Sequence, residues 1–151
     1  MTRPNPFIAH TALIQPLVDL GASVHSSLDA GLSFLVRIRA SQINGCTASL
    51  FNNLRLAREN GESEERLGVL AAWRRSPLFS SRERAALAWA EALTLVSAAG
   101  VPDDVYKAFA AEFSEEEQVR LTLMIALVNG FNRLGVGFAV GHPPVAAAKA
   151  A

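Results

Sequence analysis

The spacing of apolar residues constrains the fold of this chain most strongly. Apolar side chains recur at intervals of three and four residues, and a strict alternation of apolar and polar residues does not persist anywhere. The first pattern places the apolar side chains on one face of a helix, whereas alternation is typical of strands. The sequence therefore predicts an all-α protein, a helical bundle of about six to seven helices.

Local start and stop signals divide the chain into helices. Asp29 and Ser63 are suited to cap a helix, and the pairs Ser80/Glu83 and Ser114/Glu117 have the spacing of a capping box. Asn-Gly pairs at 44–45 and 60–61 are typical helix stops. We expect helices over residues 11–28, 30–43, 46–59, 63–73 and 81–98, a short one from 102, and a last one from 115. A proline at position 16 predicts a kink or a later start in the first of these helices.

The last expected helix differs from the others in its composition. Residues 121–128 are apolar on nearly all faces, which predicts a central or interfacial position. Polar residues follow at 129–134, and we expect them to form hydrogen bonds within the bundle. Residues 141–151, which contain Pro143, Pro144 and an alanine-rich run, are expected to form a flexible tail.

Length and composition bound the remaining possibilities. A chain of 151 residues predicts a single domain over 1–151, and its 50% apolar and 19% charged residues favour a homo-oligomer. Fourteen basic and fourteen acidic residues leave a net charge of zero, so we expect no binding of nucleic acid or of an anionic membrane. The sequence has neither an apolar leader at its start nor a membrane-spanning stretch, which predicts a cytoplasmic protein.

One cysteine limits the redox chemistry of the chain. Cys46 has no partner for a disulfide within the chain, so any thiol chemistry must use Cys46 alone. Two methionines and three scattered histidines, at positions 10, 25 and 142, form no ligand pattern, and no motif implies a metal or an organic cofactor. Each histidine is interpreted as a surface or packing residue.

Several segments resemble one known family. They are residues 35–46 (LVRIRASQINGC), Gly61 with 64–67 (EERL), 70–74 (LAAWR) and 81–94 (SRERAALAWAEALT). Together they resemble the AhpD-like, or carboxymuconolactone decarboxylase, family over about residues 13–133. The resemblance implies an all-α fold around a helical hairpin, assembly as trimers or as hexamers, and hydroperoxide reduction through a pair of thiols.

The chain departs from this family at three of the four redox positions. The resemblance places a glutamate, a second cysteine and a histidine where this chain has Phe34, Ser49 and Asn53; only Cys46 matches. Phenylalanine cannot relay a proton, serine cannot form a disulfide, and asparagine does not titrate. The two-cysteine cycle therefore cannot operate within this chain.

Two functions from different classes remain open. A helix N-terminus stabilises a thiolate, so Cys46 could serve a one-cysteine peroxidase that an external thiol reduces, with Thr47 and Ser49 orienting the peroxide. Alternatively, Cys46 is a buried packing residue in a non-catalytic member that binds a small apolar ligand or acts as an assembly subunit. Phe34 and Phe51 favour an apolar pocket near the altered site, although packing could equally have closed it.

Two groups of arginines are candidates for an anion site. Arg37 and Arg39 form one pair, and the run 73–75 (WRR) forms the other. Each could bind an anion or a carboxylate. Solvated helix faces or salt bridges between subunits are the competing interpretation.

Overall fold

The computed structural model describes residues 2–143, and within this range the chain is helical and has no strand. The helices are α1 (Pro6–Ala9), α2 (Thr11–Ser26), α3 (Ala30–Asn44), α4 (Thr47–Glu59), α5 (Glu64–Val69), the 3-10 helix η1 (Leu70–Arg75), α6 (Ser81–Thr94), α7 (Val96–Ala99), α8 (Asp103–Glu112) and α9 (Glu115–Gly137). The predicted all-α class is confirmed.

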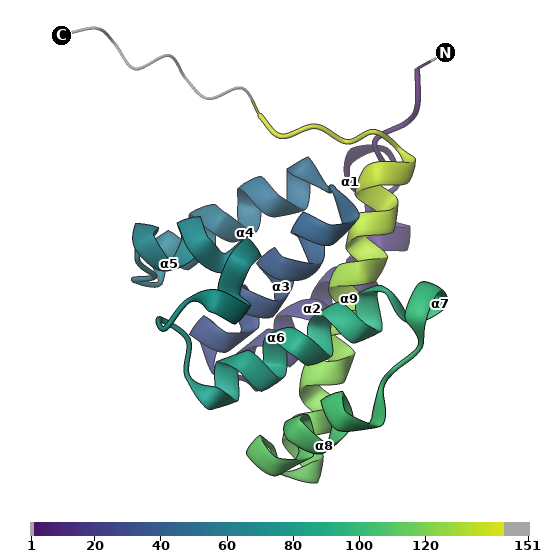
Figure 1. The fold of residues 1–151 in the computed structure, drawn as a ribbon. Helices are drawn as coiled ribbons and strands as arrows, with labels where there is room; N and C mark the ends of the chain where they lie inside the picture. The colour runs from purple at the N-terminus through teal and green to yellow at the C-terminus, as the bar shows by residue number, and fades with distance from the viewer. Residues whose placement is uncertain (1, 144–151) are drawn as a thin grey trace, which may run out of the picture.

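Helix α3 lies at the centre of the bundle. It packs against α4, α6 and α9, and it contains the fully buried residues Leu35, Val36 and Ile38. The long helix α9 runs along the molecule from α8 at one end to α1 at the other (Figure 1). Both α3 and α9 therefore hold the interior position that the sequence predicted for the last helix alone.

Two apolar clusters lie around α3. The first joins α2, α3, α6, α8 and α9, and it contains a stack of Trp89 on Phe109 with ring centroids 4.7 Å apart. The second joins α3 and α4 to the α5–α6 region through residues such as Leu70 and Trp73. Burial of these apolar surfaces is the main favourable term that holds the helices together.

Most predicted helix boundaries agree with the structure to within two residues, and larger differences occur at α1, at α5 and at the end of α6. Both capping boxes form, at Ser80 and at Ser114. The helix expected over 81–98 ends at Thr94 because Leu95 has non-helical angles (φ −102°, ψ 17°), and the chain resumes as α7. The helix expected over 63–73 is α5 followed by a 3-10 turn, and α1 precedes the first expected helix. Pro16 lies inside α2, which starts at Thr11 rather than later.

Hydrogen bonds between asparagine side chains connect the end of α3 to α9. Asn44 Nδ2 donates to Asn129 Oδ1 and to Asn132 Oδ1, each at 2.9 Å. Asn132 Nδ2 donates in turn to Ser41 Oγ, and Asn129 Nδ2 donates to Thr94 Oγ1. The predicted hydrogen bonds of the 129–134 segment within the bundle are thus confirmed.

The turn between α3 and α4 lies directly against α9. Gly45 ends α3 in the left-handed conformation (φ 64°), and Cys46 follows as the N-cap residue of α4. Gly135 of α9 is so close that a Cβ atom at this position would lie 2.6 Å from Cys46 Sγ. A side chain at Gly135 would therefore overlap the sulfur atom.

Helix α9 ends in a turn that directs the chain back over the bundle. Ala139 has a left-handed φ of 54°, and Val140 N–H donates to the Gly135 carbonyl at 2.8 Å. This is the Schellman arrangement of helix ends. The ring of His142 then stacks on Phe51 at 4.7 Å. Of the tail expected at 141–151, residues 144–151 lie outside the described residues.

Among residues 2–143, none of the helices combines the length and the apolar character needed to cross a membrane.

The contact between Gly135 and Cys46 can be tested by substitution. Gly135→Ala is expected to lower the free energy of unfolding by about 1–3 kcal/mol, because the new methyl group overlaps Sγ. In a Cys46→Ala background this loss should largely disappear. Gly130 in the same helix is the matched control: a Cβ atom there would meet no neighbouring residue within 4 Å, so Gly130→Ala should raise stability by up to about 1 kcal/mol. Equal effects at both glycines in urea unfolding would contradict the described contact.

Candidate functional site

Cys46 is buried at the start of α4. Its side chain is 1% exposed, and its Sγ lies 3.3 Å from Ser49 Oγ one turn later. On its outer side it borders a surface hollow of about 310 Å³, together with Thr47 and Gly135. The structure therefore brings Cys46 and Ser49 together, as the motif predicts, but it covers the sulfur atom.

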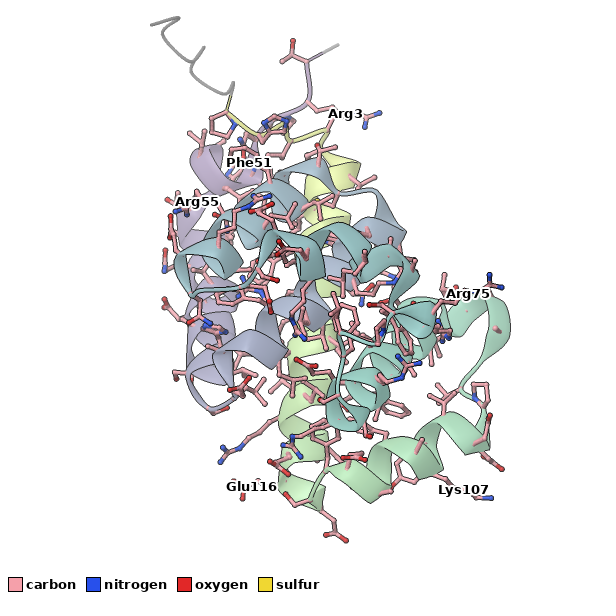
Figure 2. The ribbon with its side chains drawn as sticks, turned by 60° about the vertical axis from the view of Figure 1, so that its left-hand side comes forward. Arg3, Phe51, Arg55, Arg75, Lys107 and Glu116 are labelled. Carbon is pink, nitrogen blue, oxygen red and sulfur yellow. The ribbon has the colours of Figure 1, made fainter. Side chains whose placement is uncertain are left out.

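The rings of Phe34 and Phe51 have different neighbours. Phe34 is buried, with its ring 4.9 Å from the His25 ring and the Arg37 guanidinium 5.4 Å from its centroid. Phe51 stacks on His142 near the end of the molecule that holds Arg3, while Lys107 and Glu116 lie at the opposite end (Figure 2). Neither Phe34 nor Phe51 is among the residues that line the cavity of about 470 Å³ in this part of the fold.

A cavity of about 470 Å³ does exist, and other residues form it. Its lining comes from α1, α2, α3, α4, α9 and the turn after α9. The apolar and small residues are Phe7, Val18, Gly21, Ala22, Ala48, Met124, Val128, Phe131 and Val140, and the polar residues are His25, Arg37, Ser49, Asn52 and Asn53. Two of the four motif positions, Ser49 and Asn53, thus face this cavity, whereas Cys46 does not line it.

Asn53 has unmet hydrogen-bonding capacity. It is 3% exposed, and its Oδ1 has no hydrogen-bond partner among residues 2–143. Among the buried side-chain oxygen and nitrogen atoms of the described chain, Asn53 Oδ1 alone lacks a hydrogen-bond partner. Buried polar groups in native proteins are nearly always hydrogen-bonded, and an unpaired one indicates a ligand or a water molecule as the missing partner.

Arg37 has an unpaired charge on the same cavity. No ion pair or side-chain hydrogen bond of the described residues includes its guanidinium. Burial lowers the pKa of Arg37 from its ordinary value, although an arginine stays protonated at neutral pH. The pKa of His25 is also lowered, first by burial and then by the neighbouring Arg37 charge. His25 is therefore neutral at neutral pH, with its Nδ1 2.8 Å from Ser33 Oγ.

Of the other arginines singled out in the sequence, Arg39 and Arg74 have a carboxylate partner within the chain, and Arg75 is exposed. Arg39 Nε donates to Glu91 Oε1 at 2.7 Å, and Arg74 pairs with the second oxygen of the same carboxylate. Trp73 Nε1 also donates to Glu91, at 2.9 Å. These contacts lower the pKa of Glu91 despite its partial burial. They form an internal ion pair, which is a different arrangement from the solvated faces or subunit salt bridges expected.

Within the part of the chain that the structure describes, no group of three or more histidine, cysteine, aspartate or glutamate side chains is arranged to hold a metal ion.

Sequence reasoning missed His25 as a residue of the site and left Arg37 undecided. The sequence indicates only a surface or packing role for His25, yet it lines the cavity with Val18, Gly21 and Ala22. The signal that could have found it is the spacing 18, 21, 22 and 25, which places these residues on one face of α2. What this face meets depends on the tertiary packing of α2 against α9.

The unpaired amide of Asn53 predicts an unusual response to substitution. Asn53→Leu is expected to keep or raise the free energy of unfolding by about 1 kcal/mol, because it removes an unsatisfied buried group. Asn132 is the matched control: it is similarly buried but fully hydrogen-bonded. Asn132→Leu should cost about 1–3 kcal/mol, because Asn44 and Ser41 lose a partner. Urea unfolding of both variants measures the difference, and a comparable loss at both positions would show that Asn53 is also satisfied.

Comparisons with known proteins agree with this architecture. The family model described as the carboxymuconolactone decarboxylase family matches residues 13–92. The uncharacterized protein YdfG of Bacillus subtilis (strain 168) is 36% identical over 111 residues, which are 74% of this chain and 76% of YdfG. The uncharacterized protein YnjA of Escherichia coli (strain K12) is 35% identical over 125 residues, 82% of this chain and 66% of YnjA.

Solved structures show the same fold. A protein of unknown function from Agrobacterium tumefaciens, described as a candidate AhpD antioxidant defence protein, superposes with a TM-score of 0.91 at 36% identity, covering 96% of this chain and all of the other. The debrominase Bmp8 in complex with 2,3,4-tribromopyrrole superposes with a TM-score of 0.81 at 18% identity, covering 89% of this chain and 73% of Bmp8. With its motif segments, its helical fold and these similarities together, the chain belongs to the carboxymuconolactone decarboxylase family and has the AhpD-like fold.

Proposed function

We propose that this protein binds a small, largely apolar molecule in the cavity between α2, α4 and α9, and that it does not reduce hydroperoxides through a thiol pair. The observation that carries this proposal is the buried Asn53 Oδ1, which has no partner among the described residues and belongs to a residue of the cavity wall. A bound molecule that contacts Asn53 would complete the hydrogen bonding of this side-chain amide.

The size and lining of the cavity support ligand binding. Pockets for small molecules commonly measure about 300–1,000 Å³ and are mostly apolar with a few placed polar groups. This cavity, at about 470 Å³, has that composition. Its polar residues come from three helices, so a ligand there would contact α2, α3 and α4 at once.

The altered motif supports a loss of redox chemistry. Ser49 and Asn53 stand where the resemblance places the second thiol and the histidine, and Phe34 stands where it places the carboxylate. A disulfide-forming cycle needs two sulfur atoms, and the chain has one cysteine. Ser49 and Asn53, which face the cavity at two of the altered positions, are suited to hydrogen bonding rather than to proton transfer.

Binding can be measured with a neutral fluorescent probe. Nile red, whose emission rises in apolar surroundings, is expected to bind the purified protein with a stoichiometry near one per chain. Ala22→Trp should weaken this binding at least about tenfold, because the indole fills space at the exposed edge of the cavity. Ala12→Trp, on the same helix but outside the cavity lining, should leave it unchanged. Equal binding by both variants would place the probe elsewhere and count against the cavity.

A one-cysteine peroxidase is the second candidate, and one contact favours it. Cys46 Sγ lies within hydrogen-bonding distance of Ser49 Oγ, a polar group that could orient a peroxide at the start of α4. The thiolate would attack the peroxide O–O bond, forming a sulfenic acid and releasing an alcohol or water. An external thiol would then reduce the sulfenic acid through a mixed disulfide, with a second thiol equivalent releasing the free cysteine.

The rate of peroxide oxidation distinguishes the two candidates. Because the sulfur is covered, we expect Cys46 to react with hydrogen peroxide and cumene hydroperoxide no faster than free cysteine. Mass spectrometry of the sulfenic acid measures this rate, with Cys46→Ser as the control. Oxidation about a hundredfold or more faster than free cysteine, with turnover restored by an added thiol, would establish the peroxidase instead.

We also propose that the chain self-associates and that the protein is cytoplasmic. Leu13 of α2 and Val119 and Leu123 of α9 are exposed apolar residues that could pack between copies. A trimer or hexamer, as the resemblance implies, would bury such surface, and an assembly role for the chain depends on it.

A further inference from the structure

We propose that the ligand of this cavity is an organic anion: a molecule with one acidic group on an apolar body, held at its charged end by Arg37. This inference rests on the proposed binding function and deepens it by naming the chemical class of the ligand. The carboxylate of an aliphatic or aromatic monoacid is the simplest group that fits.

The charge state of Arg37 is the first reason. Two other half-buried arginines of the described chain each have carboxylate partners: Arg39 pairs with Glu91, and Arg66 pairs with Glu62 and Glu83. Arg37 is also partly buried, but no carboxylate of the described residues contacts it. A cation withdrawn from water without a partner is unfavourable, so this position favours an anion from outside the chain.

The lining of the cavity is the second reason. It contains no aspartate or glutamate, so the guanidinium of Arg37 is its single full charge at neutral pH. An anionic group entering the cavity meets attraction without repulsion, because His25 is neutral there. A cationic ligand would be repelled by the Arg37 charge, with no carboxylate of the lining to attract it. The cavity therefore selects the sign of the charge as well as the apolar body.

The surroundings of Arg37 orient its guanidinium for such a contact. Its Cζ lies 5.4 Å from the centre of the Phe34 ring, a distance at which the ring face attracts the cation. No salt bridge of the described residues uses the guanidinium N–H groups of Arg37, so they are available as donors. Arginine binds carboxylates through two parallel N–H groups, and the amide N–H groups of Asn53 on the next helix can donate a third bond.

The apolar part of the ligand has a separate wall. Met124, Val128 and Phe131 follow one another along a single face of α9, and all three line the cavity. The polar residues of the site lie on α2, α3 and α4 instead. A molecule with one charged end and an apolar body matches this division, whereas a compact inorganic anion would leave the α9 wall unused.

Competition with Nile red tests the charge preference, using three ligands of equal chain length: octanoate, 1-octanol and octylamine. Octanoate is expected to displace the probe at least about tenfold more effectively than octanol, and octylamine least of all. Arg37→Met should reduce the preference for octanoate over octanol to about twofold or less, while Arg37→Lys should keep most of it because the charge is retained. Arg75→Met, at an exposed arginine outside the cavity lining, is the matched control and should bind like the unmodified protein.

The outcomes separate this inference from the proposed function. If octanol displaces Nile red as well as octanoate does, the cavity binds apolar molecules without regard to charge, and the anion inference is overturned while the binding function stands. If the octanoate preference persists in a folded Arg37→Met variant, the anion is held elsewhere and Arg37 has no part in it. If Arg37→Met fails to fold, the three ligands on the unmodified protein and on Arg37→Lys still decide the preference. If Nile red itself does not bind, the binding function falls as well.

Discussion

The hydrogen bonds of Asn44 are the constraint on which the site depends. This side chain lies in the last turn of α3 and donates to two asparagines of α9 at once. Because Asn129 and Asn132 are buried and Asn44 is partly buried, losing one partner would leave polar groups unsatisfied, and the register between α3 and α9 is correspondingly well defined. That register places the α3–α4 turn against Gly135 and, further along α9, opens the cavity.

The consequence is a separation of the cysteine from the polar groups that the motif places beside it. Cys46, Ser49 and Asn53 are spaced to lie along one face of α4. The α9 backbone at Gly135 covers the first of them, whereas the other two line the cavity. Ser49 is the link, since it contacts the sulfur and also faces the cavity. The sulfur atom of Cys46 and the proposed ligand site are therefore adjacent but separate.

The parts of this structure that could be predicted are those that depend on local sequence. Capping at Asp29, Ser80 and Ser114 is a property of a few consecutive residues, and each cap forms as expected. The end of α6 at Thr94 was missed because the helical pattern continues through Leu95 in the sequence, while the backbone there does not. Local sequence signals predict where a helix starts more reliably than where it ends, because the end also depends on packing.

The site was harder to predict because it depends on which helix faces meet. Phe34 and Phe51 both lie within the motif in sequence. Phe34 nevertheless lies in the core, whereas Phe51 stacks on His142. Arg37 and Arg39 are equivalent by composition, but they point to different neighbours, and only Arg39 reaches Glu91. Residues two positions apart on a helix point to different sides and meet different neighbours. The unpaired charge of Arg37 could therefore be identified only from the assembled fold.

The turn after α9 has a consequence for how molecules reach the interior. It brings Val140 to the cavity wall, and Phe7 of the four-residue helix α1 closes the same wall from the other end of the chain. Short terminal segments undergo local opening at a lower free energy than the packed core. Exchange of a small molecule with solvent can therefore proceed by transient release of these two segments, at rates set by local fluctuations, while the central helices α3 and α9 stay in place.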